Sequence, residues 1–142
     1  MTNEEFIAQN RQADVHRLAL SKTPEGIDIH FCLQQIAGMQ AAERKLPSWA
    51  NREGIIFPPK ISMEQCSSEK TALYKQQLVK RLPPADRHNM ADLTGGFGID
   101  FSYLAQLFDK ADYVERNEQL CEIARHNFDI LGLGGAKIYN KT

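Results

Sequence analysis

Residues 90–101 have the sequence MADLTGGFGIDF, in which a short apolar run ends at Asp92 and a glycine-rich turn follows. The apolar run predicts a buried strand, and the residues from Ile99 onward predict a helix. Glycine adopts backbone angles that other residues avoid, and its lack of a side chain lets a ligand approach the main chain. A strand, a glycine-rich turn and a helix N-terminus often form a site for a nucleotide-like ligand. We therefore expect Gly96 and Gly98 to lie where such a ligand approaches most closely.

Two further predicted strands follow this turn. Residues 111–115 predict a strand that ends at Glu115, and residues 136–139 predict a third strand. An acidic side chain at the end of the second strand can accept hydrogen bonds from both hydroxyls of a ribose. Asn140 is the polar residue after the third strand and is the candidate for framing an adenine. The alternation of strands and helices from residue 89 onward predicts an α/β fold.

The first 82 residues have a different pattern, which predicts helices joined by irregular segments. Helices are expected over residues 3–20, over residues 28–45, and from Ser67 or Ser68 to Leu82. Residues 48–62 are expected to form an apolar loop. The residues expected on the inner face of the last helix are Tyr74, Leu78 and Leu82. Pro83 and Pro84 mark a boundary, which divides the chain into a helical region (1–82) and a second region (83–142).

The composition is that of an ordinary globular protein. Of 142 residues, 42% are hydrophobic and 25% are charged, and no apolar run approaches the length needed to span a membrane. The polar, acidic N-terminus does not resemble a signal peptide, so the cytoplasm is the expected compartment. Cys32, Cys66 and Cys121 are odd in number and widely spaced, which fits neither a disulfide framework nor a zinc site. We expect no metal, and we expect Cys32 and Cys121 to be buried thiols.

The glycine pattern distinguishes between two classes of cofactor. A dinucleotide-binding turn has the pattern G-x-G-x-x-G, whereas Phe101 stands here at the place of the third glycine. Asp92 at the start of the turn suits a ligand that carries an ammonium group and no pyrophosphate. The pattern therefore favours S-adenosylmethionine (SAM) over NAD, and an NAD-dependent oxidoreductase remains the least favoured alternative.

The region from Met90 to Phe101 resembles motif I of class I SAM-dependent methyltransferases, in a style closest to those that modify RNA. The segment 113–117, together with His126-Asn127 and Leu131-Gly132-Leu133, resembles motif II and its helix. Thr94 departs from the commonest form, since it replaces the first glycine of the loop. The resemblance implies a Rossmann-like fold with SAM as cofactor. The cofactor-binding residues that it implies are Asp92, Thr94, Gly95, Gly96, Phe97, Gly98, Glu115 and Arg116.

The N-terminal region is similar to a largely uncharacterised bacterial group of methyltransferases. The segments that carry this similarity are 33–38, 46–49 and 63–69. Members of the group are similar to enzymes with a THUMP-like RNA-binding domain at the C-terminal end. The resemblance implies RNA as a partner.

Ser67, Ser68 and Thr71 stand just before motif I. In many class I enzymes polar residues at this place close over the methionine end of SAM, so these three hydroxyls are candidates for that role. The alternative is that they cap the N-terminus of the helix that follows.

A class I methyltransferase sheet has seven strands, whereas the sequence predicts only about three, from residue 89 onward. We therefore expect the chain to be the N-terminal, cofactor-binding portion of a longer enzyme, with the catalytic residues beyond residue 142. The isolated chain is then expected to be inactive, and the unpaired edge of its sheet offers a surface for self-association. The alternative function is a non-catalytic RNA- or protein-binding module with a remnant half-sheet.

Two features of the N-terminal region admit an RNA-binding interpretation and a simpler one. One interpretation is that a group of cations forms a basic rim that binds RNA phosphates; these are Arg44, Lys45, Arg52 and Lys60. The simpler one is that they only make the surface soluble, as scattered cations usually do. Trp49 is either a platform for a stacked base or the anchor of a packed loop. The second interpretation is favoured for both.

Overall fold

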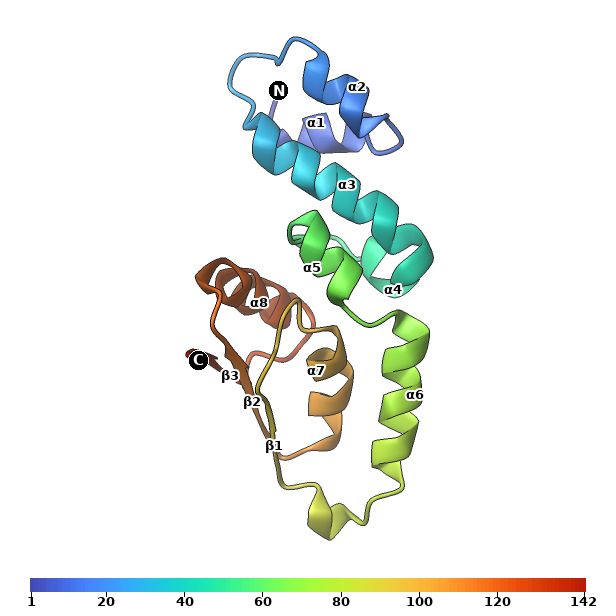
Figure 1. Ribbon diagram of the computed structural model, residues 1–142, viewed down its shortest axis with the longest axis vertical. Coiled ribbons are helices and arrows are strands. Elements are labelled where there is room, and N and C mark those ends of the chain that lie inside the picture. Colours follow the sequence, from blue (N-terminus) through green and yellow to red (C-terminus); the bar gives the residue numbers. More distant parts are fainter.

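The computed structural model describes residues 1–142 and contains helices followed by a small parallel sheet (Figure 1). The N-terminal helices are α1 (Asn3–Gln9), α2 (Val15–Leu20), α3 (Ile29–Lys45), α4 (Pro47–Ala50), α5 (Lys60–Gln65) and α6 (Glu69–Lys80). The elements after them are η1 (Pro84–Asp86), β1 (Asn89–Asp92), α7 (Ile99–Leu104), η2 (Ala105–Leu107), β2 (Lys110–Glu115), α8 (Glu118–Ile130) and β3 (Lys137–Asn140). None of the helices has the length and apolar character needed to cross a membrane.

The sheet has three parallel strands in the order β1-β2-β3, so the predicted fold class is confirmed. Asp92 pairs with Tyr113, and Glu115 pairs with Asn140, which aligns the carboxyl ends of the strands at one edge. Helices α7 and α8 lie on the same side of the sheet (Figure 1). Tyr113 of β2 is fully buried beneath them, among the rings of Phe101 and Phe128.

The prediction of one helix over residues 3–20 is wrong. The chain forms α1 and α2 instead, because Asp14 caps a new helix by accepting hydrogen bonds from the amides of His16 and Arg17. Asn10 ends α1. The turn between the helices lets α1 and α2 fold back against α3, where Phe6 is buried with residues of α3.

The prediction of a loop over residues 48–62 is also wrong in part. Pro47 ends α3 as expected, but it also occupies the first turn of α4, where its missing amide hydrogen costs nothing. A further helix, α5, begins at Lys60 after Pro59. These helices are too short for a periodic apolar pattern to reveal them from the sequence.

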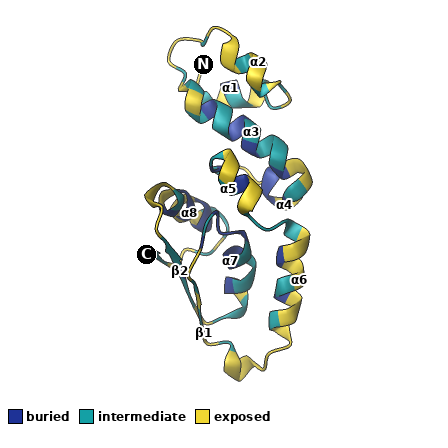
Figure 2. Ribbon diagram, in the orientation of Figure 1, coloured by how far each residue is buried: buried dark blue, intermediate teal, exposed yellow.

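Helix α6 turns a different face inward from the one predicted. Tyr74 is 64% exposed, and Leu78 and Leu82 are also exposed. Figure 2 shows that much of α6 is exposed and that only a few of its residues are buried. The buried residues are the small Ala72 and the polar Gln76, whose amide donates to the carbonyl of Tyr103 at 2.7 Å. A small side chain lets α6 approach α7 closely, and this packing outweighs the burial of the larger apolar residues.

The two regions on either side of Pro83 share one hydrophobic core. Trp49, Phe57 and Met63 from the N-terminal region are buried in the same cluster as Phe97 and Ile99. Polar contacts join the regions as well. Residues 55–57 pass between the buried amide side chains of Gln35 and Asn127. The Gln35 side chain forms hydrogen bonds with the backbone of Phe57, and the Asn127 side chain with the backbone of Ile56.

Candidate functional site

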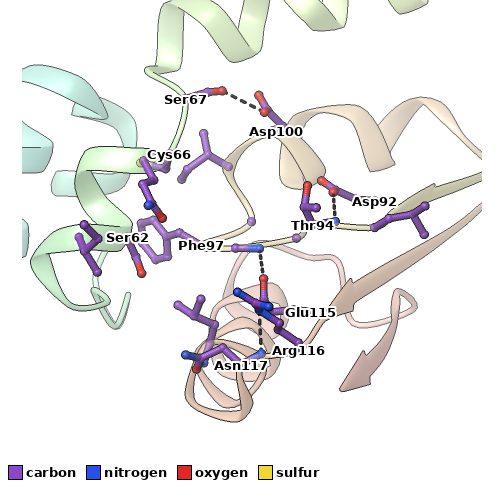
Figure 3. Close-up of a pocket in the computed structure, with 18 of the residues that line it drawn as sticks. Ser62, Cys66, Ser67, Asp92, Thr94, Phe97, Asp100, Glu115, Arg116 and Asn117 are labelled. Atoms are coloured by element: carbon purple, nitrogen blue, oxygen red, sulfur yellow. Dashed lines mark hydrogen bonds between the residues drawn. The ribbon is translucent and has the colours of Figure 1, made fainter. Parts of the chain in front are cut away.

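A cavity of about 720 Å³ lies at the carboxyl ends of β1 and β2. Its walls come from the glycine-rich turn between β1 and α7, from the start of α8, and from the segment that includes α5 and the residues before α6 (Figure 3). The lining residues at the end of the chain are Lys141 and Thr142. The volume of this cavity lies within the range of small-molecule sites.

The glycines of the turn meet two different needs. A Cβ atom at Gly95 would lie 2.2 Å from the ring of Tyr113, and one at Gly98 would lie 2.9 Å from the ring of Phe128. Both positions therefore exclude side chains because of core packing. Gly96 has a φ of +56°, and its Cβ would meet nothing closer than the Thr94 carbonyl oxygen at 3.7 Å. Of the three glycines, only Gly96 leaves open space where its side chain would be, and it lines the cavity.

Phe97 anchors the turn to the N-terminal region. Its ring is 3% exposed and lies edge-on to Trp49, with ring centroids 5.1 Å apart. The ring centroid of Phe57 lies 6.0 Å from that of Phe97. Since Trp49 is itself 3% exposed, its indole is a packed anchor and has no free face on which to stack a base.

Glu115 holds the glycine-rich turn against β2. Its Oε1 accepts the amide hydrogen of Gly96 at 3.0 Å, and its Oε2 accepts that of Asn117 at 2.7 Å (Figure 3). The Tyr113 hydroxyl donates to the carbonyl of Gly96, and burial raises the pKa of that hydroxyl well above its usual value. Each oxygen of Glu115 keeps a further lone pair, so the carboxylate can accept hydrogen bonds from a ligand as well.

The remaining predicted residues of the turn and of β2 lie in the same cavity. Asp92 and Thr94 line it, and the Thr94 amide donates to Asp92 Oδ1 at 3.1 Å. Arg116 also lines it, next to Glu115 (Figure 3). Asn140 does not line the cavity, because its amide donates to the carbonyls of Glu115 and Arg116 and fixes the backbone there.

The three hydroxyl residues before motif I separate into two groups. Ser67 lines the cavity, whereas Ser68 and Thr71 do not. The Ser68 hydroxyl oxygen accepts the amide hydrogen of Thr71 at 3.2 Å and thereby caps α6. This capping arrangement is the alternative that the sequence left open.

Several lining residues were not expected from the sequence. Ser62, Gln65 and Cys66 reach the cavity from α5 and the residue after it. The short α5 has no periodic apolar pattern that would predict it, so the positions of these side chains in the cavity were not expected. Burial raises the pKa of the Cys66 thiol, although the nearby Lys45 ammonium opposes this shift.

Asp100, in the first turn of α7, was also missed and lies at the end of the cavity next to Ser67. Its Oδ2 accepts hydrogen bonds from the Ser67 hydroxyl and from the Lys75 ammonium, each at 2.9 Å. The signal in the sequence that could have identified Asp100 as a lining residue was its position at the start of the helix after the glycine-rich turn.

Three of the four cations of the proposed basic rim have contacts within the chain. The Arg52 guanidinium donates to the carbonyl of Ile130 at 2.7 Å, and the Lys45 ammonium donates to that of Met63 at 2.7 Å. Lys60 lies 4.0 Å from Glu64. These contacts support the simpler interpretation, in which the cations serve the surface and the packing. No three His, Cys, Asp or Glu side chains come together in a way that could hold a metal ion.

Comparison with known proteins gives one informative match. Neither a family model nor a curated protein matches the sequence. The fold is similar to the crystal structure of a protein from Porphyromonas gingivalis W83 that is provisionally named a methyltransferase, with a TM-score of 0.74 and 28% sequence identity over 96% of this chain. The chain has a methyltransferase-type fold. It spans 33% of the length of that neighbour.

Proposed function

We propose that the cavity beside the glycine-rich turn binds SAM and that residues 83–142 are the cofactor-binding part of an RNA methyltransferase. The observation that carries the proposal is the contact between Glu115 and Gly96. It places a carboxylate of the kind that binds ribose hydroxyls against Gly96, which lines the cavity and is the one glycine of the turn whose Cβ position is not filled by a core side chain. The similarity to a methyltransferase-type fold supports the choice of cofactor.

The residues present fit this cofactor. The cavity of about 720 Å³ suits a ligand of the size of SAM. Glu115 has lone pairs available for ribose hydroxyls, and Asp92 offers a further acceptor at the end of β1. A side chain at Gly96 would take up space in the cavity, so the glycine keeps the main chain accessible to the ligand.

When bound, SAM supplies a methyl group activated by a sulfonium, which a nucleophile attacks in line. The role of this chain is to orient the cofactor, because positioning contributes most to such a transfer. Arg116 and Asn117 flank the carboxylate of Glu115 and complete that end of the cavity. We assign no residue of this chain to the methyl acceptor.

RNA as the methyl acceptor rests on the resemblance of the turn to RNA-modifying enzymes. The helical region 1–82 shares its core with the cofactor-binding region, so we propose that it supports the turn as one unit with residues 83–142. We expect the isolated 142 residues to bind the cofactor without transferring its methyl group. The free edges of the sheet would allow self-association, which size-exclusion chromatography of the same sample measures.

Calorimetric titration with S-adenosylhomocysteine tests the proposal. Wild type should bind, and Gly96→Ala and Glu115→Ala should each bind at least about tenfold more weakly, a change of about 1.4 kcal/mol. Gly132→Ala is the matched control for Gly96→Ala. Gly132 also has a positive φ, +76°, but has no neighbour within 4 Å and lies outside the cavity.

Two results would contradict the proposal. A folded wild-type chain that ignores the cofactor but binds RNA would favour the alternative, a non-catalytic binding module. Methyl transfer to RNA by the isolated chain, measured with labelled SAM, would disprove its expected inactivity.

A further inference from the structure

We infer that Asp100 recognises the amino-acid end of the ligand by accepting hydrogen bonds from its ammonium group. The inference rests on the proposed SAM site and adds a residue of the motif I region that was not among the predicted cofactor-binding residues.

The position of Asp100 follows from the shape of the site. Glu115, Arg116 and Asn117 lie at one end of the close-up, and Ser67 and Asp100 lie at the opposite end, with the glycine-rich turn between them (Figure 3). SAM is elongated, with its adenine at one end, its amino acid at the other and its ribose between them. If Glu115 holds the ribose and the adenine lies on the side of Lys141 and Thr142, the amino acid extends toward Asp100.

The hydrogen bonds of Asp100 are unevenly divided between its two oxygens. Oδ2 accepts hydrogen bonds from both Ser67 and Lys75, whereas Oδ1 is shielded from solvent and accepts none. An ionised oxygen without a donor is unfavourable in a folded protein and calls for an explanation. The side chain as a whole keeps 30% of its surface exposed. Asp100 lines the cavity, so its carboxylate has capacity for a further donor, which an ammonium group in the cavity would supply.

The charges on this wall favour a cation over an anion. The lining residues contributed by α5, by the segment after it and by α7 are Ile61, Ser62, Gln65, Cys66, Ser67, Ile99 and Asp100. Asp100 is the one charged residue among them. Lys75 contacts its carboxylate but does not line the cavity. A ligand therefore meets a carboxylate at this wall, which suits an ammonium group.

Ser67 has a different role in this arrangement from the one that its position before motif I indicates. Its hydroxyl donates to Asp100, and the Lys75 ammonium donates to the Ser67 hydroxyl oxygen at 3.3 Å. The hydroxyl is thus committed to the carboxylate. Ser67 is a positioning residue that holds Asp100 at the cavity wall and ties the segment before α6 to α7.

Two ligands that differ only at the amino-acid end test the inference. S-adenosylhomocysteine carries the amino acid, whereas 5′-methylthioadenosine keeps the nucleoside and the sulfur but lacks it. Calorimetry should show that Asp100→Asn binds S-adenosylhomocysteine at least about tenfold more weakly, with its affinity for 5′-methylthioadenosine unchanged within about twofold. Retained binding of the second ligand also demonstrates that the variant is folded. Asp86→Asn, at an exposed site in η1 outside the cavity, is the matched control and should leave both affinities unchanged.

The outcomes separate this inference from the proposed function. Failure of wild type to bind either ligand would mean that the cofactor site is wrong, and the role of Asp100 would fall with it. If wild type binds both ligands and Asp100→Asn weakens both equally or neither, the cofactor site stands and the role of Asp100 is overturned. Ser67→Ala should weaken S-adenosylhomocysteine alone, by less than Asp100→Asn does.

Discussion

Phe97, in the middle of the glycine-rich turn, packs edge-on against Trp49, which lies 48 positions earlier in the chain and 5.1 Å away between ring centroids. The contact joins the turn to the N-terminal helices. Both rings belong to the core that also contains Phe57, Met63 and Ile99. The conformation of the candidate site therefore depends on residues far from the motif that marks it.

Replacement of Trp49 should be strongly destabilising. Trp49→Ala removes a buried aromatic side chain and should lower the free energy of unfolding by about 3–5 kcal/mol, and Trp49→Phe by less. Urea denaturation followed by circular dichroism measures both. A loss below about 1 kcal/mol for Trp49→Ala would show that the indole is not a packed anchor.

Gly95 and Tyr113 should be energetically coupled. Gly95→Ala places a methyl group against the Tyr113 ring and should cost about 1–3 kcal/mol or more, because the core is already filled. In a Tyr113→Val background the same substitution should cost much less. A double-mutant cycle measures the difference. Equal costs in both backgrounds would mean that another constraint excludes a side chain at position 95.

Asn127 should be important for joining the two regions. Its side chain is fully buried and exchanges two hydrogen bonds with the backbone of Ile56, at 2.9 and 2.8 Å. Asn127→Ala leaves a buried donor and a buried acceptor unpaired, so it should cost about 2–4 kcal/mol. It should also speed hydrogen exchange at the Ile56 amide. Asn51→Ala, which removes an exposed hydrogen bond, is the control and should change stability by about 0.5 kcal/mol or less.

The two faces of α6 should respond differently to substitution. Tyr74→Ser, on the exposed face, should change the free energy of unfolding by about 0.5 kcal/mol or less. Ala72→Leu, at the fully buried contact with α7, should destabilise by about 1–3 kcal/mol through overpacking. Thermal or urea unfolding measures both. If Tyr74→Ser destabilised the protein more than Ala72→Leu does, the inner face of α6 would be the one that the sequence pattern predicts.

Stability should fall at high pH. Burial raises the pKa of Tyr113 above its ordinary value of 10.0, so the folded state holds this proton more tightly than the unfolded state does. Its stabilising contribution is therefore complete below pH 10 and is lost as the pH rises further, at up to about 1.4 kcal/mol per pH unit. Urea unfolding between pH 8 and 11 should show the decline, and Tyr113→Phe should make it shallower above pH 10. An unchanged slope in that variant would exclude Tyr113 as a cause.

The sequence predicts the parallel sheet correctly because each of its elements carries a local signal. The short apolar strands, the glycine-rich turn and the stripe of α8 need only neighbouring residues to be recognised. The helices α4 and α5 lack such a signal, since α4 spans about one turn and α5 fewer than two. Their positions depend on Leu46, Trp49 and Met63, which are buried by residues distant in the chain.

The sequence by itself determined the order of strands and helices, the glycine-rich turn, and the acidic residue that ends β2. Only the tertiary structure decided that Gly95 and Gly98 make room for Tyr113 and Phe128, that α6 buries Ala72 in place of Tyr74, and that Asp100 meets Ser67 at the cavity wall. The physical reason is the distance along the chain over which each interaction acts. Turns and strands follow from backbone preferences and local patterning, whereas close packing and the pairing of buried polar groups depend on which distant segments meet.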